Sequence, residues 1–176
     1  MSNIAHKLNE LKARISETAE KCGRSADEIL LVAVTKLASV EDIRAAYDAG
    51  QRDFGENYMQ KILPKMENLP EDINWHFIGA VQKNKINKML GRFVLVHSID
   101  SMEIASAFQM RAARENILQR ILIEVNTSGE ISKHGIAPEM AGELSGYITE
   151  NCPNLILDGI MTVAPFTSDR NEIVRS

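Results

Sequence analysis

The sequence predicts an α/β fold in which parallel β-strands alternate with α-helices. Short apolar runs rich in β-branched residues alternate six times with segments of helical periodicity. The connections are long enough to hold a helix, and such connections make neighbouring strands parallel through right-handed crossovers. Each expected strand also ends in a polar or small residue. The alternation leaves open both a doubly wound sheet and a (β/α)8 barrel, although there is no GxGxxG fingerprint for the first and six strands are too few to close the second.

The first elements are predicted from hydrophobic periodicity and from residues that begin or end helices. Ile4, Leu8, Leu11 and Ile15 recur at helical spacing, with Ser2 as the expected cap and a stop near Gly23. Residues 29–36, "ILLVAVTK", form a buried strand by length and β-branched content. Ser39 caps the next helix and Gly50 ends it. The remaining strands are expected at 52–57, 74–79, 92–98, 120–128 and 154–162, with helices at about 58–66, 82–90, 101–115 and 138–149 between them.

The composition indicates one ordinary globular domain. The chain has 176 residues, of which 44% are hydrophobic and 25% are charged. The formal net charge of -4 gives no general attraction to nucleic acid or to an anionic membrane. No stretch approaches the ~20 apolar residues that span a bilayer, and no signal peptide is visible. Cys22 and Cys152 fit no metal-ligand spacing, so reduced thiols in a cytosolic protein are expected.

The polar residues at the strand ends should converge on one face, because the carboxyl ends of parallel strands lie together. They are Lys36, Glu56 with Asn57, Gly79, His97 with Ser98, Asn126 with Thr127, and Met161 with Thr162. Lys36 either extends its ammonium to water or points into a site. In an apolar pocket the pKa of a lysine falls, and its neutral amine can attack an aldehyde or ketone. Schiff-base chemistry is therefore predicted, with either pyridoxal phosphate or a substrate carbonyl.

Six motifs resemble those of one family in order and approximate spacing. They are "LLVAVTK", "FGENYMQ", "WHFIGAVQKNK", "VHSID", "VNTSGEISKHGI" and "GIMTVAPF". The family is that of the pyridoxal phosphate homeostasis proteins, also called proline synthetase co-transcribed homologues. The resemblance covers the chain from the first helix to its end.

The resemblance implies a (β/α)8 TIM-type barrel related to the N-terminal domain of alanine racemase, with residues 1–176 forming one domain that covers about six βα units and an N-terminal helix. It implies that Lys36 holds pyridoxal 5'-phosphate as a Schiff base, with Asn57 and Met161 also binding the cofactor. Asn57 has an alternative role as a helix cap, and Met161 as core. The implied function is cytoplasmic cofactor homeostasis without turnover, as a carrier or regulator that serves apoenzymes. The expected form is a monomer or weak dimer without nucleic-acid, membrane or metal partners.

The alternative function is a racemase-like enzyme that uses the same cofactor. It needs an acid/base partner across the ring, and we expect no Tyr or Cys at a strand end. The family also continues through two further βα units that hold the phosphate and the pyridine nitrogen. We therefore expect this chain to lack the phosphate-binding segment.

Several other residues have two interpretations each. His76 lines the site or belongs to the core, and His97 with Ser98 lines the site while Asp100 caps a helix. Lys133 either contacts the aldehyde or phosphate or is an ordinary loop lysine. The cluster Lys83, Lys85 and Lys88 is expected to be a solvated helix face.

Overall fold

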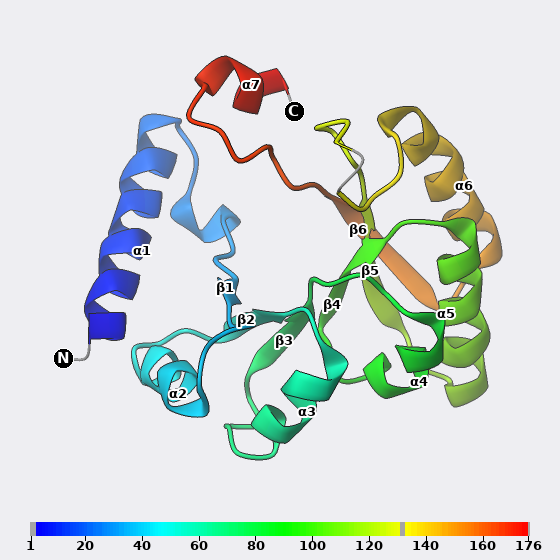
Figure 1. The fold of residues 1–176 in the computed structure, drawn as a ribbon, viewed down its shortest axis with the longest axis horizontal. Helices are drawn as coiled ribbons and strands as arrows, with labels where there is room; N and C mark the ends of the chain where they lie inside the picture. The colour runs from blue at the N-terminus through cyan, green and yellow to red at the C-terminus, as the bar shows by residue number, and fades with distance from the viewer. Residues whose placement is uncertain (1–2, 131–132, 176) are drawn as a thin grey trace. The chain divides into compact units, whose positions relative to one another are not determined.

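The computed structural model describes residues 3–130 and 133–175. The chain forms two compact units, Met1–His76 and Phe77–Ser176 (Figure 1). The strands follow one another in the sheet in chain order, from β1 to β6, and the pairings β1–β2, β4–β5 and β5–β6 are parallel. These observations confirm the predicted parallel α/β architecture. Within the described residues the strand order has two ends, β1 and β6.

The first unit contains the N-terminal helix and the first strands. Its elements are α1 (Asn3–Lys21), the 3-10 helix η1 (Ala26–Glu28), β1 (Ala33–Val34), α2 (Val40–Asp48), β2 (Asp53–Glu56), α3 (Met59–Met66) and the start of β3 (Asn74–Phe77). Ser39 caps α2 as predicted, in a capping box with Asp42. Gly50 follows α2 with a φ of +88°, a backbone conformation that favours glycine. The predicted cap Ser2 lies outside the described residues.

The predicted strand over residues 29–36 is wrong in length and in burial. Only Ala33 and Val34 pair with β2, opposite Phe54 and Gly55. Val34 is 56% exposed, and Leu30 is 63% exposed. The physical reason is that β1 has one strand neighbour in the part of the chain that the structure describes, so a second strand does not cover its other edge.

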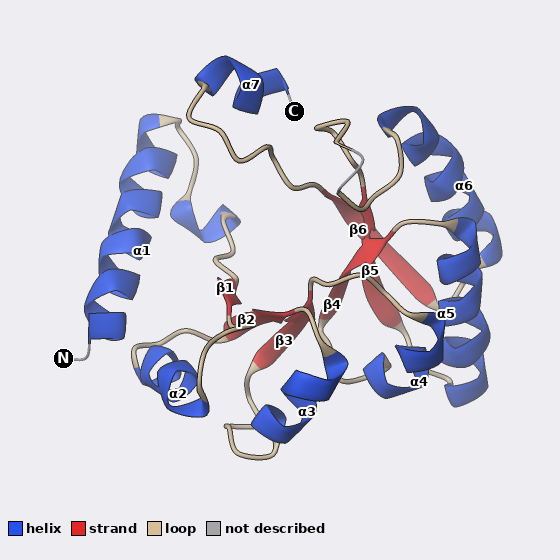
Figure 2. Ribbon diagram, viewed as in Figure 1, coloured by secondary structure: helices blue, strands red, loops and turns tan. Residues whose placement is uncertain are grey.

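The second unit contains the later strands and their covering helices. Its elements are η2 (Lys83–Lys85), α4 (Ile86–Met89), β4 (Leu95–Ile99), α5 (Met102–Glu115), β5 (Gln119–Glu124), η3 (Pro138–Met140), α6 (Ala141–Asn151), β6 (Leu155–Met161) and α7 (Arg170–Arg175). Helices α5 and α6 pack together beside β5 and β6 (Figure 2). Phe108, Ile121 and Ile148 are buried in the core between them. This core fixes the carboxyl ends of β5 and β6, where the polar residues of this unit lie.

The second unit differs from prediction at two helices. The helix expected at 82–90 is a 3-10 turn followed by the four-residue α4. Ser101, and not Asp100, caps α5, because the Ser101 hydroxyl accepts the backbone N–H of Ile104 at 3.2 Å. Among the described residues, no helix is both long and apolar enough to cross a membrane.

Candidate functional site

A buried polar network in the first unit holds the end of β1 against β2 and α3. The backbone N–H of Thr35 donates to the carbonyl of Gly55 at 2.9 Å, and the Thr35 hydroxyl donates to Glu56 Oε1 at 3.0 Å. Lys65 Nζ of α3 donates to Glu56 Oε1 at 2.6 Å and to the backbone carbonyl of Thr35 at 2.9 Å. The Glu56 side chain is fully buried, and that of Lys65 is 14% exposed. One ammonium thus neutralises a buried carboxylate and fixes the residue before Lys36.

Lys36 itself lies in the turn between β1 and α2 and is exposed. Of its two interpretations, this exposure fits an ammonium that extends to water in the part of the chain that the structure describes. Its amine is accessible from solvent, while the backbone immediately before it is held by the buried network. A nucleophile at a fixed point of the backbone needs less ordering when it reacts than one on a free loop.

Among the described residues, two buried acceptor atoms at the end of β2 have no hydrogen-bond partner. They are Glu56 Oε2 and Asn57 Oδ1. Asn57 is not the helix cap that was its alternative role, because α3 begins after Tyr58 and has no side-chain cap. A buried acceptor without a donor costs free energy, so such atoms in a native fold call for an explanation. Asn57 thus retains hydrogen-bonding capacity next to the network that positions Lys36.

His76 belongs to the core of the first unit. Its side chain is 3% exposed, and its Nε2 lies 3.1 Å from Asp53 Oδ1. Trp75, its neighbour on β3, packs against Phe54 with ring centroids 5.8 Å apart. Of its two interpretations, the structure favours a core histidine held by a carboxylate.

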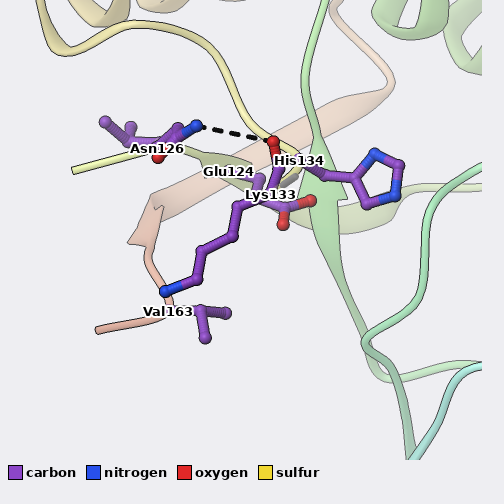
Figure 3. Close-up of a pocket in the computed structure, with 6 residues that line it drawn as sticks. Glu124, Asn126, Lys133, His134 and Val163 are labelled. Atoms are coloured by element: carbon purple, nitrogen blue, oxygen red, sulfur yellow. Dashed lines mark hydrogen bonds between the residues drawn. The ribbon is translucent and has the colours of Figure 1, made fainter. Parts of the chain in front are cut away.

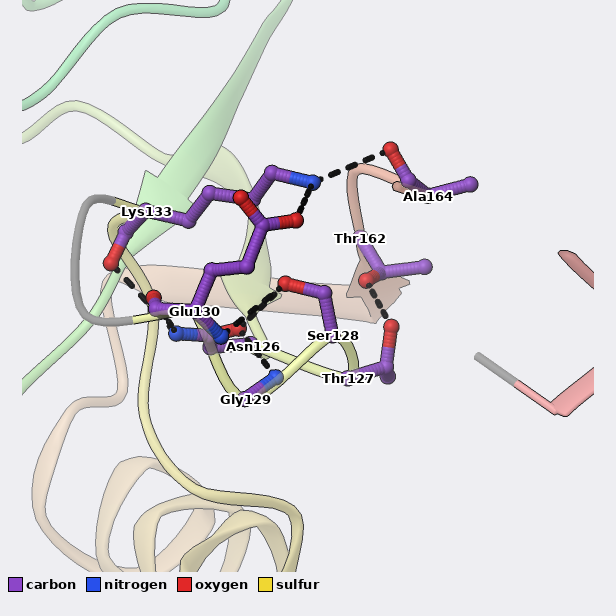
Figure 4. Close-up of polar contacts among 8 residues, drawn as sticks. All are labelled: Asn126, Thr127, Ser128, Gly129, Glu130, Lys133, Thr162 and Ala164. Carbon is purple, nitrogen blue, oxygen red and sulfur yellow. Dashed lines mark hydrogen bonds and ion pairs between the residues drawn. The ribbon is translucent and has the colours of Figure 1, made fainter. Parts of the chain in front are cut away.

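In the second unit, Asn126 organises the loop that follows β5 (Figure 4). Its Oδ1 accepts the Ser128 hydroxyl and the Gly129 N–H, both at 3.1 Å. Its Nδ2 donates to the backbone carbonyl of Glu130 at 2.9 Å. The returning end of the loop is held to β5 by backbone bonds from Asn126 N to Ile136 O at 2.8 Å and from Ile136 N to Glu124 O at 2.9 Å. The loop after β5 is therefore held in place by its own hydrogen bonds and by its bonds to the end of β5.

Lys133 lies on this loop with its ammonium already paired. It contacts Glu130 Oε1 at 2.8 Å and donates to the carbonyl of Ala164 at 3.2 Å (Figure 4). The hydroxyls of Thr127 and Thr162 share a hydrogen bond of 2.7 Å. These contacts connect the segments that follow β5 and β6.

Met161 ends β6 beside Glu124 of β5. The two residues are register partners, and the Met161 carbonyl accepts the N–H of Val125 at 2.9 Å. A pocket of about 200 Å³ opens here, lined by Glu124, Val125, Asn126, Lys133, His134 and Val163 (Figure 3). Burial raises the pKa of the Glu124 carboxyl, His134 counteracts this rise, and Asp100 adds to it.

Ser98, Lys83 and Lys88 of the second unit have contacts or exposure that need no ligand. Ser98 is buried and its hydroxyl donates to the carbonyl of Gly79. Lys83 forms an exposed ion pair with Glu103, and Lys88 is exposed. Lys83 and Lys88 are thus solvated as expected, whereas Lys85 is half-buried.

Sequence reasoning missed Lys65 and Glu124. The pattern around Lys65 is that of an amphipathic helix, in which a lysine is an ordinary surface charge. No residue next to it in the sequence indicates that its side chain contacts the end of β1. Glu124 gave a usable signal, because a lone carboxylate inside the apolar run "ILIEV" is expensive to bury unless it has a purpose. Tyr58 does not stand at a strand end, but it follows β2 by two residues and is 53% exposed, and an expectation confined to the strand ends does not cover it.

Comparisons with known proteins identify the class of this domain. The alanine racemase N-terminal domain family matches residues 6–174, so the chain carries a domain of that class. The chain is 38% identical over 172 residues to the pyridoxal phosphate homeostasis protein of Aquifex aeolicus, covering 97% of this chain and 75% of that protein. This chain belongs to the pyridoxal phosphate homeostasis protein family.

Two solved structures extend the comparison. A protein from Bifidobacterium adolescentis has a TM-score of 0.91 at 33% identity, over 98% of this chain and 74% of its own. PipY from Synechococcus elongatus with PLP bound has a TM-score of 0.69 at 29% identity, over 87% of this chain and 72% of its own.

Proposed function

We propose that this chain binds pyridoxal 5'-phosphate through a Schiff base on Lys36 and acts as a carrier or regulator in cofactor homeostasis. The observation that carries the proposal is an accessible lysine placed directly after the buried network of Thr35, Glu56 and Lys65. Family membership and the PLP-bound structure of PipY support the choice of ligand. The cofactor would supply an aldehyde that reacts reversibly with amines.

The residues of the first unit fit the aldehyde end of this cofactor. Lys36 offers an amine to solvent, and Asn57 offers an amide oxygen that has no partner in the described residues. Lys36 Nζ would form a C=N bond with the aldehyde carbon, and the aldehyde oxygen would leave as water. Met161 is proposed as a further cofactor-binding residue on the family resemblance alone.

The role of carrier needs the link to be reversible and the lysine to be reachable. Exposure of Lys36 supports both, because an acceptor amine can approach the carbon that Lys36 holds. We propose that apoenzymes receive the cofactor and that the chain works in the cytoplasm.

The experiment that tests the proposal is reductive labelling. The protein is mixed with pyridoxal phosphate and reduced with borohydride, and the modified peptides are mapped by mass spectrometry. We expect the adduct on Lys36 and its loss in Lys36→Ala, because Lys36 is exposed directly after the buried network, whereas the ammonium groups of Lys65 and Lys133 are already paired. Lys61→Ala, which removes an exposed lysine of α3, is the matched control and should leave the labelling unchanged. An adduct spread over exposed lysines, or found mainly on Lys133, would contradict the assignment.

A racemase-like enzyme is the second candidate, and Tyr58 is the observation that favours it. Its phenol is exposed and directly follows Asn57, so it would serve as the acid/base group of such an enzyme although it does not stand at a strand end. Amino-acid racemisation with added cofactor separates the two functions. Sustained turnover that disappears in both Lys36→Ala and Tyr58→Phe would favour the enzyme, whereas the carrier should show no turnover above the free cofactor.

A further inference from the structure

The pocket at the carboxyl end of β5 contains a buried carboxylate without a partner. Glu124 is 9% exposed and lines the pocket. In the part of the chain that the structure describes, its carboxylate has no hydrogen bond or ion pair. Figure 3 shows the carboxylate between the side chains of Lys133 and His134 in that view. A buried carboxylate is expensive unless a donor or cation approaches it.

Two of the neighbouring polar groups, Lys133 and Asn126, already have partners. The Lys133 ammonium is held by Glu130 and by the carbonyl of Ala164, and the Asn126 amide is used within its own loop. The Lys133 charge is therefore balanced locally by Glu130. The Glu124 carboxylate is therefore an acceptor without a hydrogen-bond donor in the described residues, and its charged surroundings are His134, which attracts it, and Asp100, which repels it.

The size of the pocket limits what it can hold. Its volume is about 200 Å³, whereas one water occupies roughly 30 Å³ in the liquid. The space therefore fits a molecule of several heavy atoms, and Val125 and Val163 give it apolar walls. The described residues contain no cluster of three or more His, Cys, Asp or Glu that could hold a metal. The fitting ligand is a compact organic cation with N–H donors and a short apolar part.

We propose that this pocket binds the ammonium group of a small primary amine or amino acid, with the Glu124 carboxylate as its acceptor. The ammonium donates to Glu124, and the carbon chain lies against the two valines. This inference goes beyond the proposed function and does not depend on Lys36.

The test is a chemical-shift titration of the ¹⁵N-labelled protein without pyridoxal phosphate. The probes are ethylamine, L-alanine, tetramethylammonium and acetate, and the signals are the amides of Val125, Asn126 and His134. Ethylamine or alanine should shift these amides, whereas tetramethylammonium, which has no N–H donor, and acetate should not. Alanine binding more tightly would identify an amino acid as the ligand, and equal or tighter binding of ethylamine would identify a simple amine.

Glu124→Gln removes the charge and keeps the shape of the side chain. We expect it to weaken binding by roughly 10- to 100-fold, the value of a charge-assisted hydrogen bond. Glu143→Gln, which removes an exposed charge from α6, is the matched control and should bind as the wild type does. Lys36→Ala should also bind normally, which separates this inference from the proposed cofactor link. The wild-type probes still decide the matter if Glu124→Gln does not fold.

The pH dependence gives an independent measurement. The ammonium binds the ionised carboxylate, so binding is complete above the pKa of Glu124 and is lost as the pH falls through it. Because burial raises that pKa, the loss should occur at a higher pH than for an ordinary carboxyl, with His134 and Asp100 as the nearby groups that modify it. Unchanged binding in Glu124→Gln, shifts that map elsewhere, or equal shifts with acetate would overturn the proposal.

Discussion

The Lys65→Met variant is expected to lose about 3–5 kcal/mol of unfolding free energy, the usual cost of removing one partner from a buried ion pair. The substitution keeps much of the side-chain volume but removes the donor to Glu56 Oε1 and to the Thr35 carbonyl. The fully buried carboxylate would then keep the Thr35 hydroxyl as its donor, and its second oxygen already has none. The charge would be left in a site from which water is excluded.

Urea unfolding of the variant and of two controls checks this expectation. Lys61→Met removes an exposed ammonium from the same helix and should change stability by less than about 0.5 kcal/mol. The double variant Glu56→Gln with Lys65→Met removes both charges and should recover a large part of the loss. A Lys65→Met protein as stable as Lys61→Met would show that the ion pair contributes nothing to the fold.

The same variant has a functional consequence under the proposed role of Lys36. Because Lys65 holds the carbonyl of Thr35, its loss should loosen the backbone next to the reactive amine. Reductive labelling of Lys36 should become slower in Lys65→Met. In the double variant Glu56→Gln with Lys65→Met, the stability should recover to a larger extent than the rate of labelling does. Equal recovery of both would indicate that Lys65 acts on stability alone.

Much of the fold could be predicted from the sequence, because strands and helices differ in the period of their hydrophobic residues and are bounded by capping residues and glycines. The capping box at Ser39 and the left-handed glycine after α2 were both visible as local signals. The extent of β1 could not be predicted in this way, because "ILLVAVTK" has the composition of a strand covered on both sides. Whether both edges are covered depends on neighbours distant in the sequence.

The site was predictable only where a local rule applies. Lys36 and Asn57 stand at strand ends, so the parallel topology marks them. Lys65 lies on α3, the second helix after Thr35. It donates to the backbone carbonyl of Thr35, which lies 30 residues earlier in the chain. The residues around Lys65 give no local signal for this long-range contact. Glu124 could have been found as a buried charge, but its lack of a partner is a property of the folded loop.

The Gly135→Ala variant should lose about 2–5 kcal/mol of unfolding free energy. Gly135 has a φ of +105°, and a Cβ there would lie 2.8 Å from Asn126 N and 2.9 Å from Val125 C. These atoms are rigid backbone, so the loop must move away. That movement breaks the two hydrogen bonds between Ile136 and β5, each worth roughly 0.5–1.5 kcal/mol. The left-handed conformation adds a further cost of about 1–2 kcal/mol for alanine.

The matched control is Gly146→Ala in the interior of α6, where a Cβ would meet nothing within 4 Å. It should be stabilising by roughly 0.5–1 kcal/mol, because alanine favours the helix. Urea unfolding of both variants separates the local clash from a general effect of adding a methyl group. Gly135→Ala should also lose the amide shifts that ethylamine or alanine causes, since Lys133 and His134 would leave the pocket with the loop. Normal stability together with normal binding would mean that the loop tolerates a side chain here, and that its attachment to β5 does not form the pocket.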